Sequence, residues 1–401
     1  MAPPEGNNLT ARKGSCTPVA EEVRSEKLVI PKEFPNHPGG QSTLAFARES
    51  KRPDLLFLSY HLGFDLNGRI AKTAKSKKVT MPNTGPMYNE MHEAVIRIRK
   101  EHPEQYWIYV GWCLLTTVAM IVLFPMWIKY PNWFTTPTLA FLMVTYSFNI
   151  FHMRHHKGGN LYGIPWLNKL TEPFYDFMEC CWAIKPQAWI DNHQASHHLY
   201  TNFVDDHDVE NPFPFIRTHP EQPKKFYHKL QPLYTPFLFC ANGLAFPMNN
   251  FFKYNGSLFH LISWFCCTFA LPIYLHGWSA LFHVGLMYGG SSVAMAYMFQ
   301  VSHNHGDLGD RKDENIDTVD DWIRRQCAES ISWGGYFAGL FFGGINYQVE
   351  HHICPAHDST LYHFYRPELE RIARKYGVNY TYEPTFAHAV FKYHQWLYLL
   401  S

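Results

Sequence analysis

The sequence predicts a mainly α-helical membrane protein, in which four transmembrane helices carry a cytosolic cap of further helices. The first observation is a long uncharged run from Trp107 to Ile128, which can cross a bilayer as a helix. The second is the interval between Lys253 and Asp307, which contains no Asp, Glu, Lys or Arg. The third is the uneven distribution of Lys and Arg, which crowd the N-terminal part of the chain.

Two membrane hairpins account for the uncharged runs. The first joins residues 107–128 to a second apolar stretch, 133–151, through the short turn KYPN. The second joins 257–276 to 279–300. Residues 232–252 are also uncharged, but their three prolines and paired asparagines favour an interfacial or re-entrant segment. The alternative, buried helices of a soluble protein, is disfavoured because such long uncharged runs are rare there.

The distribution of positive charge predicts the orientation of these hairpins. Lys and Arg are frequent in the N-terminal motifs AKTAKSKK and RIRK and in the loop after the second span, and they are absent from the turn at 276–278. By the positive-inside rule, both termini and the central loop face the cytosol. We therefore expect a multi-pass protein whose polar regions, 152–231 and 303–401, lie on one side of the membrane.

Composition limits the remaining possibilities. The net charge of +1 gives no indication of a nucleic-acid partner. The nine cysteines form no CxxC motif, which favours a reducing compartment over a disulfide framework. The N-terminus lacks the apolar core of a signal peptide, and we expect residues 1–25 to be disordered. A linker is expected over 76–105.

Histidine motifs stand near the ends of the predicted spans. FHMRHHKGG places His152 and His156 four residues apart, so that on a helix they share a face. In DNHQASHHLYTN, His193 and His197 repeat this spacing, and His198 is expected to point about 100° further round the helix.

Two more motifs lie on the same predicted side of the membrane. FQVSHNHGD places His303 and His305 after the fourth span. GGINYQVEHHICP places Gln348 angularly between His351 and His352, so that the three side chains form a fan on one side of a helix.

Together the four motifs predict a metal centre, although each alone is more simply explained as polar residues at the membrane interface. Imidazole suits Zn, Cu, Fe and Ni, and a tetrahedral zinc needs only four ligands. The candidate ligands are enough for two metals with positions left open for oxygen or water: His152, His156, His193, His197, His198, His303, Gln348, His351 and His352.

A two-metal centre against a bilayer implies an apolar substrate that is reached from the lipid. Side-chain acid–base chemistry does not break unactivated C–H bonds, whereas iron with dioxygen does. Redox-inert zinc would instead support a membrane hydrolase or protease, but the HExxH signature is absent. The carboxylate-bridged di-iron sites of four-helix bundles use Glu-x-x-His pairs, which these motifs lack.

The three boxes, HxxxH at 152–156, HxxxHH at 193–198 and QxxHH at 348–352, resemble those of the membrane fatty acid desaturases. The glutamine of the third box is typical of the front-end subgroup. The resemblance implies a desaturase domain over 106–401, in which the box residues and His303 hold two iron ions. It also implies O2-dependent insertion of a cis double bond into an unsaturated fatty acyl chain. Met153 departs from the family pattern, which usually has Asp after the first histidine.

The segment FPNHPGGQSTLAFARESKRPDLLFLSYHLG resembles cytochrome b5. His37 of HPGG and His61, 24 residues later, match its two axial haem ligands in motif and spacing. This implies a small degenerate module over 26–75, because the Trp-containing and VYD-like strands that normally precede HPGG are missing. Two alternatives stay open: haem b bound by the module, or electrons from a separate cytochrome b5 with NADH-cytochrome b5 reductase. Both fit the endoplasmic reticulum membrane.

Other functions and roles also stay open from the sequence. An acyl or sphingoid-base hydroxylase could use the same di-iron centre, and a non-catalytic haem- or metal-binding membrane protein is a further alternative. The run of Asp205, Asp206 and Asp208 either orients ligand imidazoles or forms a solvated acidic loop. The extra histidine of the first box, His155, is expected to point away from the metals.

Overall fold

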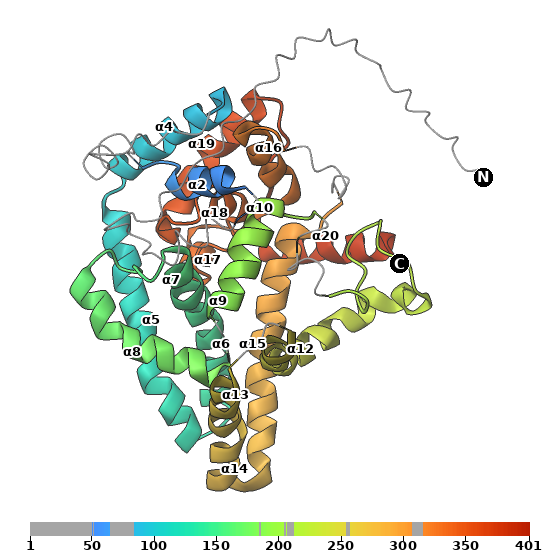
Figure 1. Cartoon of the computed structure of the whole chain (residues 1–401). Helices are drawn as coiled ribbons and strands as arrows, with labels where there is room; N and C mark the ends of the chain where they lie inside the picture. The colour runs from blue at the N-terminus through green and yellow to red at the C-terminus, as the bar shows by residue number, and fades with distance from the viewer. Residues whose placement is uncertain are drawn as a thin grey trace.

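The fold is described from a computed structural model, which covers residues 50, 52–64, 84–183, 186–203, 206, 212–253, 257–306 and 316–401. Within these ranges the chain is mainly helical, as expected, and two short strands form a small sheet. Figure 1 shows elongated helices at one end of the molecule and a cap of shorter helices at the other.

The first predicted hairpin is formed by α5 (Glu104–Lys129) and by α6 (Thr135–Tyr146), which pack side by side. The π-helical turn η1 (Ser147–His152) and α7 (Met153–His156) continue α6 without a break. Asn132 starts the second arm, because its side-chain oxygen accepts hydrogen bonds from the backbone N–H groups of Phe134 and Thr135 at 2.8 and 2.9 Å.

The second hairpin consists of α13 (Leu258–Phe265), η4 (Cys266–Ala270) and α14 (Leu271–His276), followed by η5 (Gly277–Ser279) and α15 (Ala280–His303). Gly277 makes the bend with a φ of +66°, a left-handed conformation that favours glycine. By length and composition, Glu104–Lys129 and Leu258–His303 could cross a membrane. The number of spans therefore stays a prediction.

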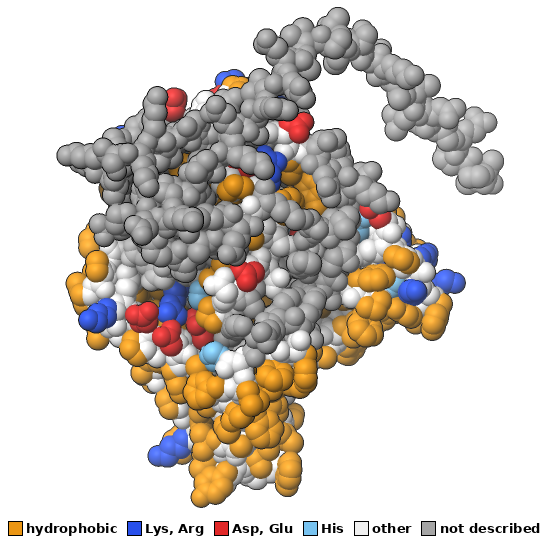
Figure 2. All heavy atoms as spheres, viewed as in Figure 1, with side chains coloured by type: hydrophobic (Ala, Val, Ile, Leu, Met, Phe, Trp, Pro, Cys, Tyr) orange, Lys and Arg blue, Asp and Glu red, His pale blue; other side chains and the backbone are white. Residues whose placement is uncertain are grey.

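The hairpins carry large apolar side chains on their outer surface. Phe259, Tyr274 and Trp278 are 66%, 84% and 77% exposed. In Figure 2 apolar atoms cover the end of the molecule formed by α13, α14 and α15. An apolar surface of this extent is typical of contact with lipid.

The cap is built around one buried core that joins helices from both ends of the chain. It contains α2 (Pro53–His61), α4 (Pro86–Glu101), α16 (Val319–Glu329), α18 (Gln348–Ile353) and α19 (Tyr362–Lys375). Figure 1 shows these helices gathered above the hairpins. Leu55, Trp322 and Leu369 are at most 1% exposed within this core.

Helix α4 differs from the linker that was expected over 76–105. Met87, Met91, Val95 and Ile98 recur at helical spacing and are buried against the cap. The prediction was wrong for α4 because it weighed the Lys, Asn, Gly and Pro content of the region and not this apolar period.

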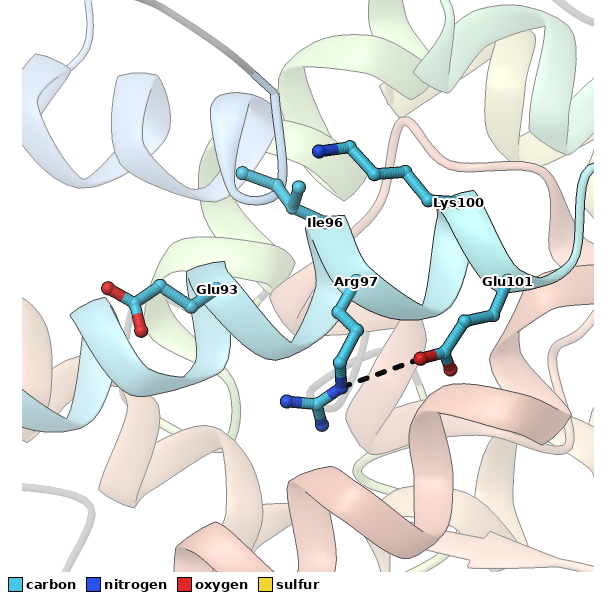
Figure 3. A pocket seen from close by; sticks show the side chains of 5 residues that line it. All are labelled: Glu93, Ile96, Arg97, Lys100 and Glu101. Carbon is cyan, nitrogen blue, oxygen red and sulfur yellow. Dashed lines mark ion pairs between the residues drawn. The ribbon is translucent and has the colours of Figure 1, made fainter.

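The outer face of α4 is charged. Arg97 pairs with Glu101 on the same helix at 3.9 Å and with Glu368 of α19 at 2.7 Å. Figure 3 shows Glu93, Ile96, Arg97, Lys100 and Glu101 along a shallow hollow on this face. Exposed ion pairs of this kind contribute little to stability, and the described residues form no cluster of potential metal ligands on this face.

Several shorter elements surround the centre of the molecule. After the long helix α8 (Pro165–Cys181) and the short α9 (Pro186–Trp189), the second histidine box lies on η2 (Ile190–His197) and α10 (His198–Tyr200). After η3 (Phe226–Leu230), α12 (Gln231–Lys253) runs unbroken through two internal prolines and packs against α15. It is not one of the two helices that could cross a membrane by length and composition among the described residues, and the interfacial placement expected for 232–252 stays a prediction.

The C-terminal part supplies a small sheet that supports α18. β1 (Ile331–Trp333) pairs in parallel with β2 (Thr381–Glu383), with Ser332 opposite Tyr382. Around it lie α17 (Tyr336–Phe341), η6 (Ser359–Leu361) and α20 (Phe386–Leu399).

Candidate metal centre

Nine side chains converge where the membrane hairpins meet the cap, and none is more than 3% exposed. One group offers four ligand nitrogens within 4.8 Å of one another, from His152, His156, His193 and His351. A second group offers three, from His197, His303 and His352. His198 and Gln348 complete the set that was predicted from the sequence.

Ring nitrogens face one another in the first group. His193 Nε2 lies 3.0 Å from His152 Nε2 and 3.2 Å from His198 Nε2. Two nitrogens that each bind one ion at about 2.1 Å are separated by about 3.0 Å when the angle between them is 90°. These distances are therefore those expected of ligands that share an ion.

The second group has the same character. His197 Nε2 lies 3.2 Å from His303 Nε2. The terminal amide of Gln348 lies 2.6 Å from His303 Nε2 and 3.1 Å from His352 Nε2. A 180° rotation of this amide exchanges its nitrogen and oxygen, and its oxygen would then face the two imidazoles as a neutral ligand.

Buried atoms without partners test whether a metal fits this cluster. His156 Nε2, both ring nitrogens of His351 and Gln348 Oε1 have no hydrogen-bond partner and are hidden from solvent. Leaving such a group unpaired costs about 1–3 kcal/mol. A metal ion would satisfy Gln348 Oε1 and one nitrogen lone pair of each imidazole. First-row transition metals are the ions that imidazole prefers. The residues therefore fit a pair of such ions, and iron is one of them.

Hydrogen bonds on the far side of three rings fix their direction. His197 Nδ1 lies 3.0 Å from Asp206 Oδ2, and His352 Nδ1 lies 2.7 Å from Gln326 Oε1. His303 Nδ1 lies 3.2 Å from the backbone oxygen of Glu329. Each of these oxygens accepts the Nδ1 proton, which leaves the Nε2 lone pair directed into the cluster.

Asp206 thereby resolves one of the open alternatives. It is completely buried and bonds His197, so it orients an imidazole and does not belong to a solvated loop. Asp205 and Asp208 lie outside the described residues.

The electrostatic environment keeps the imidazoles neutral. Burial, reinforced by neighbouring histidines, holds the pKa values of His156, His198, His351 and His352 well below the usual histidine value. Neutral imidazole is the form that binds metal ions. The cluster therefore offers lone pairs and not protons at neutral pH.

Local helix geometry explains how two side chains of the second box come together. On a regular α-helix the side chains of His193 and His198 point in different directions, but their Nε2 atoms lie 3.2 Å apart. The stretch η2 is π-helical, and residues five apart are brought together over a π-helical turn. The first box also follows a π-helical turn, η1, which ends at His152.

The third box is held in place from behind by Glu350, whose role sequence analysis missed. Its carboxylate is fully buried and accepts hydrogen bonds from Ser332 Oγ at 2.7 Å and from Tyr380 Oη at 2.5 Å. Burial raises the pKa of Glu350 to about 7. These bonds tie α18 to the small sheet, while Gln348 and His351 face the cluster.

His155 lies apart from the cluster, as expected. Its Nε2 lies 3.1 Å from Glu179 Oε1 on α8. The same carboxylate oxygen accepts a 2.7 Å hydrogen bond from Arg154. His155 thus belongs to an ion-pair network beside the first box.

Comparison with known proteins agrees with this geometry. The model of the family described as fatty acid desaturase matches residues 130–384. The chain belongs to the fatty acid desaturase family. It is accordingly an oxygen-dependent acyl desaturase, and the family is membrane-bound.

Two relatives of the desaturase extend over most of its length. The probable Delta(5) fatty acid desaturase C of Dictyostelium discoideum is 25% identical, over 91% of this chain and 88% of its own. The sn-1 linoleoyl-lipid 6-desaturase of Synechocystis is 25% identical, over 75% of this chain and 89% of its own.

A shorter match adds a relative from an alga. The chloroplastic acyl-lipid (7-3)-desaturase of Chlamydomonas reinhardtii is 29% identical, over 49% of this chain and 43% of its own. These relatives place the desaturase among front-end enzymes. No solved structure matches it.

Only one of the two expected axial haem ligands lies among the described residues of the desaturase. His37 lies outside them. His61 lies at the end of α2, where its Nδ1 is 2.7 Å from the backbone oxygen of Phe57 and its ring stacks on that of Phe57 at 4.2 Å. Haem binding therefore stays a prediction.

Gly343→Ala should lower the iron content and activity of the desaturase. Gly343 has a φ of +58°, and a Cβ atom there would lie 2.5 Å from the backbone carbon of Phe148 on η1. The loop before α18 would have to move away from η1, which would separate the first box from the third. Iron per chain and lipid product check this, with Gly335→Ala as control, because a Cβ at Gly335 meets nothing within 4 Å. Equal values for both variants would contradict the prediction.

Proposed function

We propose that the desaturase holds two iron ions through the nine buried side chains of the cluster and acts on an unsaturated acyl chain carried by a membrane lipid. The convergence of these side chains from four separate segments carries the proposal. The names of the relatives support a membrane lipid as the carrier of the acyl chain, since they include acyl-lipid and linoleoyl-lipid desaturases.

The residues of the chain prepare the site, and the irons, when bound, supply the activation of dioxygen that removes two hydrogens from the acyl chain. Asp206, Gln326 and the backbone of Glu329 hold the Nδ1 protons of three histidines, so the ligand nitrogens are presented without further rearrangement. Burial of the cluster excludes bulk water.

The position of the cluster suits an apolar substrate. The first box follows α6 directly, and His303 is the last residue of α15. Both are helices of the membrane hairpins, whose outer surface is apolar. The cluster therefore lies at the ends of helices whose outer surface suits lipid, close to where an acyl chain would be held.

We further propose four transmembrane helices with both termini in the cytosol, in the endoplasmic reticulum membrane. The proposed desaturase domain spans 106–401, with α2 and α4 packed into the core of its cap, and residues 26–75 descend from a cytochrome b5-like module. A separate cytochrome b5 and its NADH-dependent reductase supply the electrons. Haem b at His37 and His61 is the alternative donor, and the absorption spectrum of the purified chain distinguishes the two.

Expression in yeast fed with unsaturated fatty acids tests the activity. We expect new lipid-bound acyl chains that are two hydrogens lighter than the supplied acid, with the new double bond located by fragmentation of a derivative. Chains that gain an oxygen atom would instead indicate a hydroxylase. Unchanged lipids with iron bound in full would contradict the proposal.

A further inference from the structure

Helix α2, near the N-terminus, reaches the metal cluster directly. Tyr60 lies in its last turn, and the phenol oxygen is 2.9 Å from Nδ1 of His156. The other ring nitrogen of His156, Nε2, is buried without a hydrogen-bond partner. A residue far outside the three boxes therefore contacts a histidine of the first box.

We propose that Tyr60 is a positioning residue that fixes His156 as an iron ligand, so that residues 52–64 complete the metal centre. The phenol oxygen accepts the Nδ1 proton, and the Nε2 lone pair is then directed at the metal. This inference rests on the proposed function, because it takes His156 to be a ligand.

The hydrogen bond matters because imidazole has two tautomers. If the proton moves to Nε2, that nitrogen can no longer bind a metal. Other histidines of the cluster avoid this with an oxygen acceptor at Nδ1, as His197 does with Asp206 and His352 with Gln326. Tyr60 supplies the corresponding oxygen to His156.

Tyr60 is held where this contact requires it by apolar packing of its own helix. Leu55, Leu58 and Leu62 are at most 1% exposed and belong to the core of the cap. The segment is therefore part of the cap and not a loosely attached extension.

Hydrogen bonds lock the end of α2 onto the cap as well. His357 Nε2 donates to the backbone oxygen of Leu62 at 2.8 Å, and Arg99 donates to that of Gly63 at 2.9 Å. Gly63 has a φ of +75°, and a Cβ atom there would lie 2.3 Å from Val95 Cγ1. This close approach fixes the position of the chain just after Tyr60.

Tyr60→Phe removes the oxygen and keeps the ring. Tyr88→Phe is a matched control, because the Tyr88 phenol also bonds α2, at the backbone oxygen of Leu58 (3.1 Å), but no histidine of the cluster. Both full-length variants are purified in detergent and loaded with ⁵⁷Fe. Iron per chain, iron retained against a chelator, the Mössbauer spectrum and the melting temperature are measured.

We expect Tyr60→Phe to change the Mössbauer parameters of one iron of the two and to lower iron retention by about 10–100-fold, as loss of a ligand's hydrogen-bond partner does. Tyr88→Phe should leave both irons unchanged. Equal spectra and retention for the two variants, whether intact or equally weakened, would overturn the inference. His198→Ala distinguishes this from failure of the proposed function: if that variant keeps both irons, the ligand assignment itself is wrong.

Discussion

Replacement of His198 by alanine is expected to abolish desaturation and to reduce the iron content of the purified enzyme below two ions per chain. The ring of His198 lies between the two groups of ligands, with its centroid 4.6 Å from that of His156 and 4.2 Å from that of His352. Its Nε2 atom also lies 3.2 Å from His193 Nε2. Removing it takes a nitrogen from the middle of the cluster.

His351→Ala should have the same effect for a related reason. Both ring nitrogens of His351 are buried without a partner, so the residue contributes nothing evident to folding other than its packing. A neutral imidazole has one free lone pair, and the metal is the partner that this lone pair requires. We therefore expect loss of iron and of product while the variant still inserts into the membrane.

The matched control for both variants is His155→Ala. His155 stands in the first box, beside His156, but bonds Glu179 and not the cluster. Glu179 keeps its 2.7 Å hydrogen bond from Arg154 when His155 is lost. Iron and product should therefore persist. Full activity in His198→Ala, or loss of iron in His155→Ala, would show that the cluster has been misassigned.

The convergence of the histidine boxes could be predicted because it depends on few assumptions. Uncharged runs place the hairpins without knowledge of tertiary contacts, and the boxes at 152–156 and 193–198 follow from residue type and spacing. The hairpin geometry then puts the ends of α6 and α15 on the same side, where the structure also places them.

The residues that hold the ligands could not be predicted in the same way. Gln326 and Tyr60 are distant in sequence from the histidines that they bond, and no motif marks them. The close approach of His193 and His198 depends on a π-helical turn, which the spacing of the histidines did not indicate. Helix α4 was missed because the prediction considered the amino-acid composition of the segment and not the helical spacing of its apolar residues.

Asp206 shows why burial decides a question that sequence leaves open. An acidic run in a loop has the same sequence whether its side chains face solvent or a metal-binding histidine. The structure places His197 Nδ1 against both carboxylate oxygens of Asp206, at 3.2 Å from Oδ1 and 3.0 Å from Oδ2. Oδ2 also accepts from the backbone N–H of Asn202 at 2.8 Å. A carboxylate presents an acceptor at both positions, whereas an amide presents a donor at one of them.

Asp206→Asn is therefore expected to weaken iron binding by about 10–100-fold, the usual cost of losing such a partner of a metal-bound histidine. The amide has one acceptor oxygen, and in either orientation its NH₂ group would face the Nδ1 proton of His197. If the NH₂ group takes the place of Oδ2, it would also face the N–H of Asn202. The hydrogen bond that fixes the tautomer of His197 is therefore weakened in both cases. Chelator competition on the purified enzyme measures the change.

Asp191→Asn is the control for this substitution, because Asp191 is an exposed carboxylate on η2 that accepts a side-chain hydrogen bond from Gln187 at 2.7 Å. It lies two residues before His193, so it tests whether any loss of negative charge near the second box is sufficient. Iron retention should fall in Asp206→Asn alone, and desaturation should fall with it. Parallel losses in both variants would mean that the overall charge of the box, and not the orientation of His197, governs iron binding.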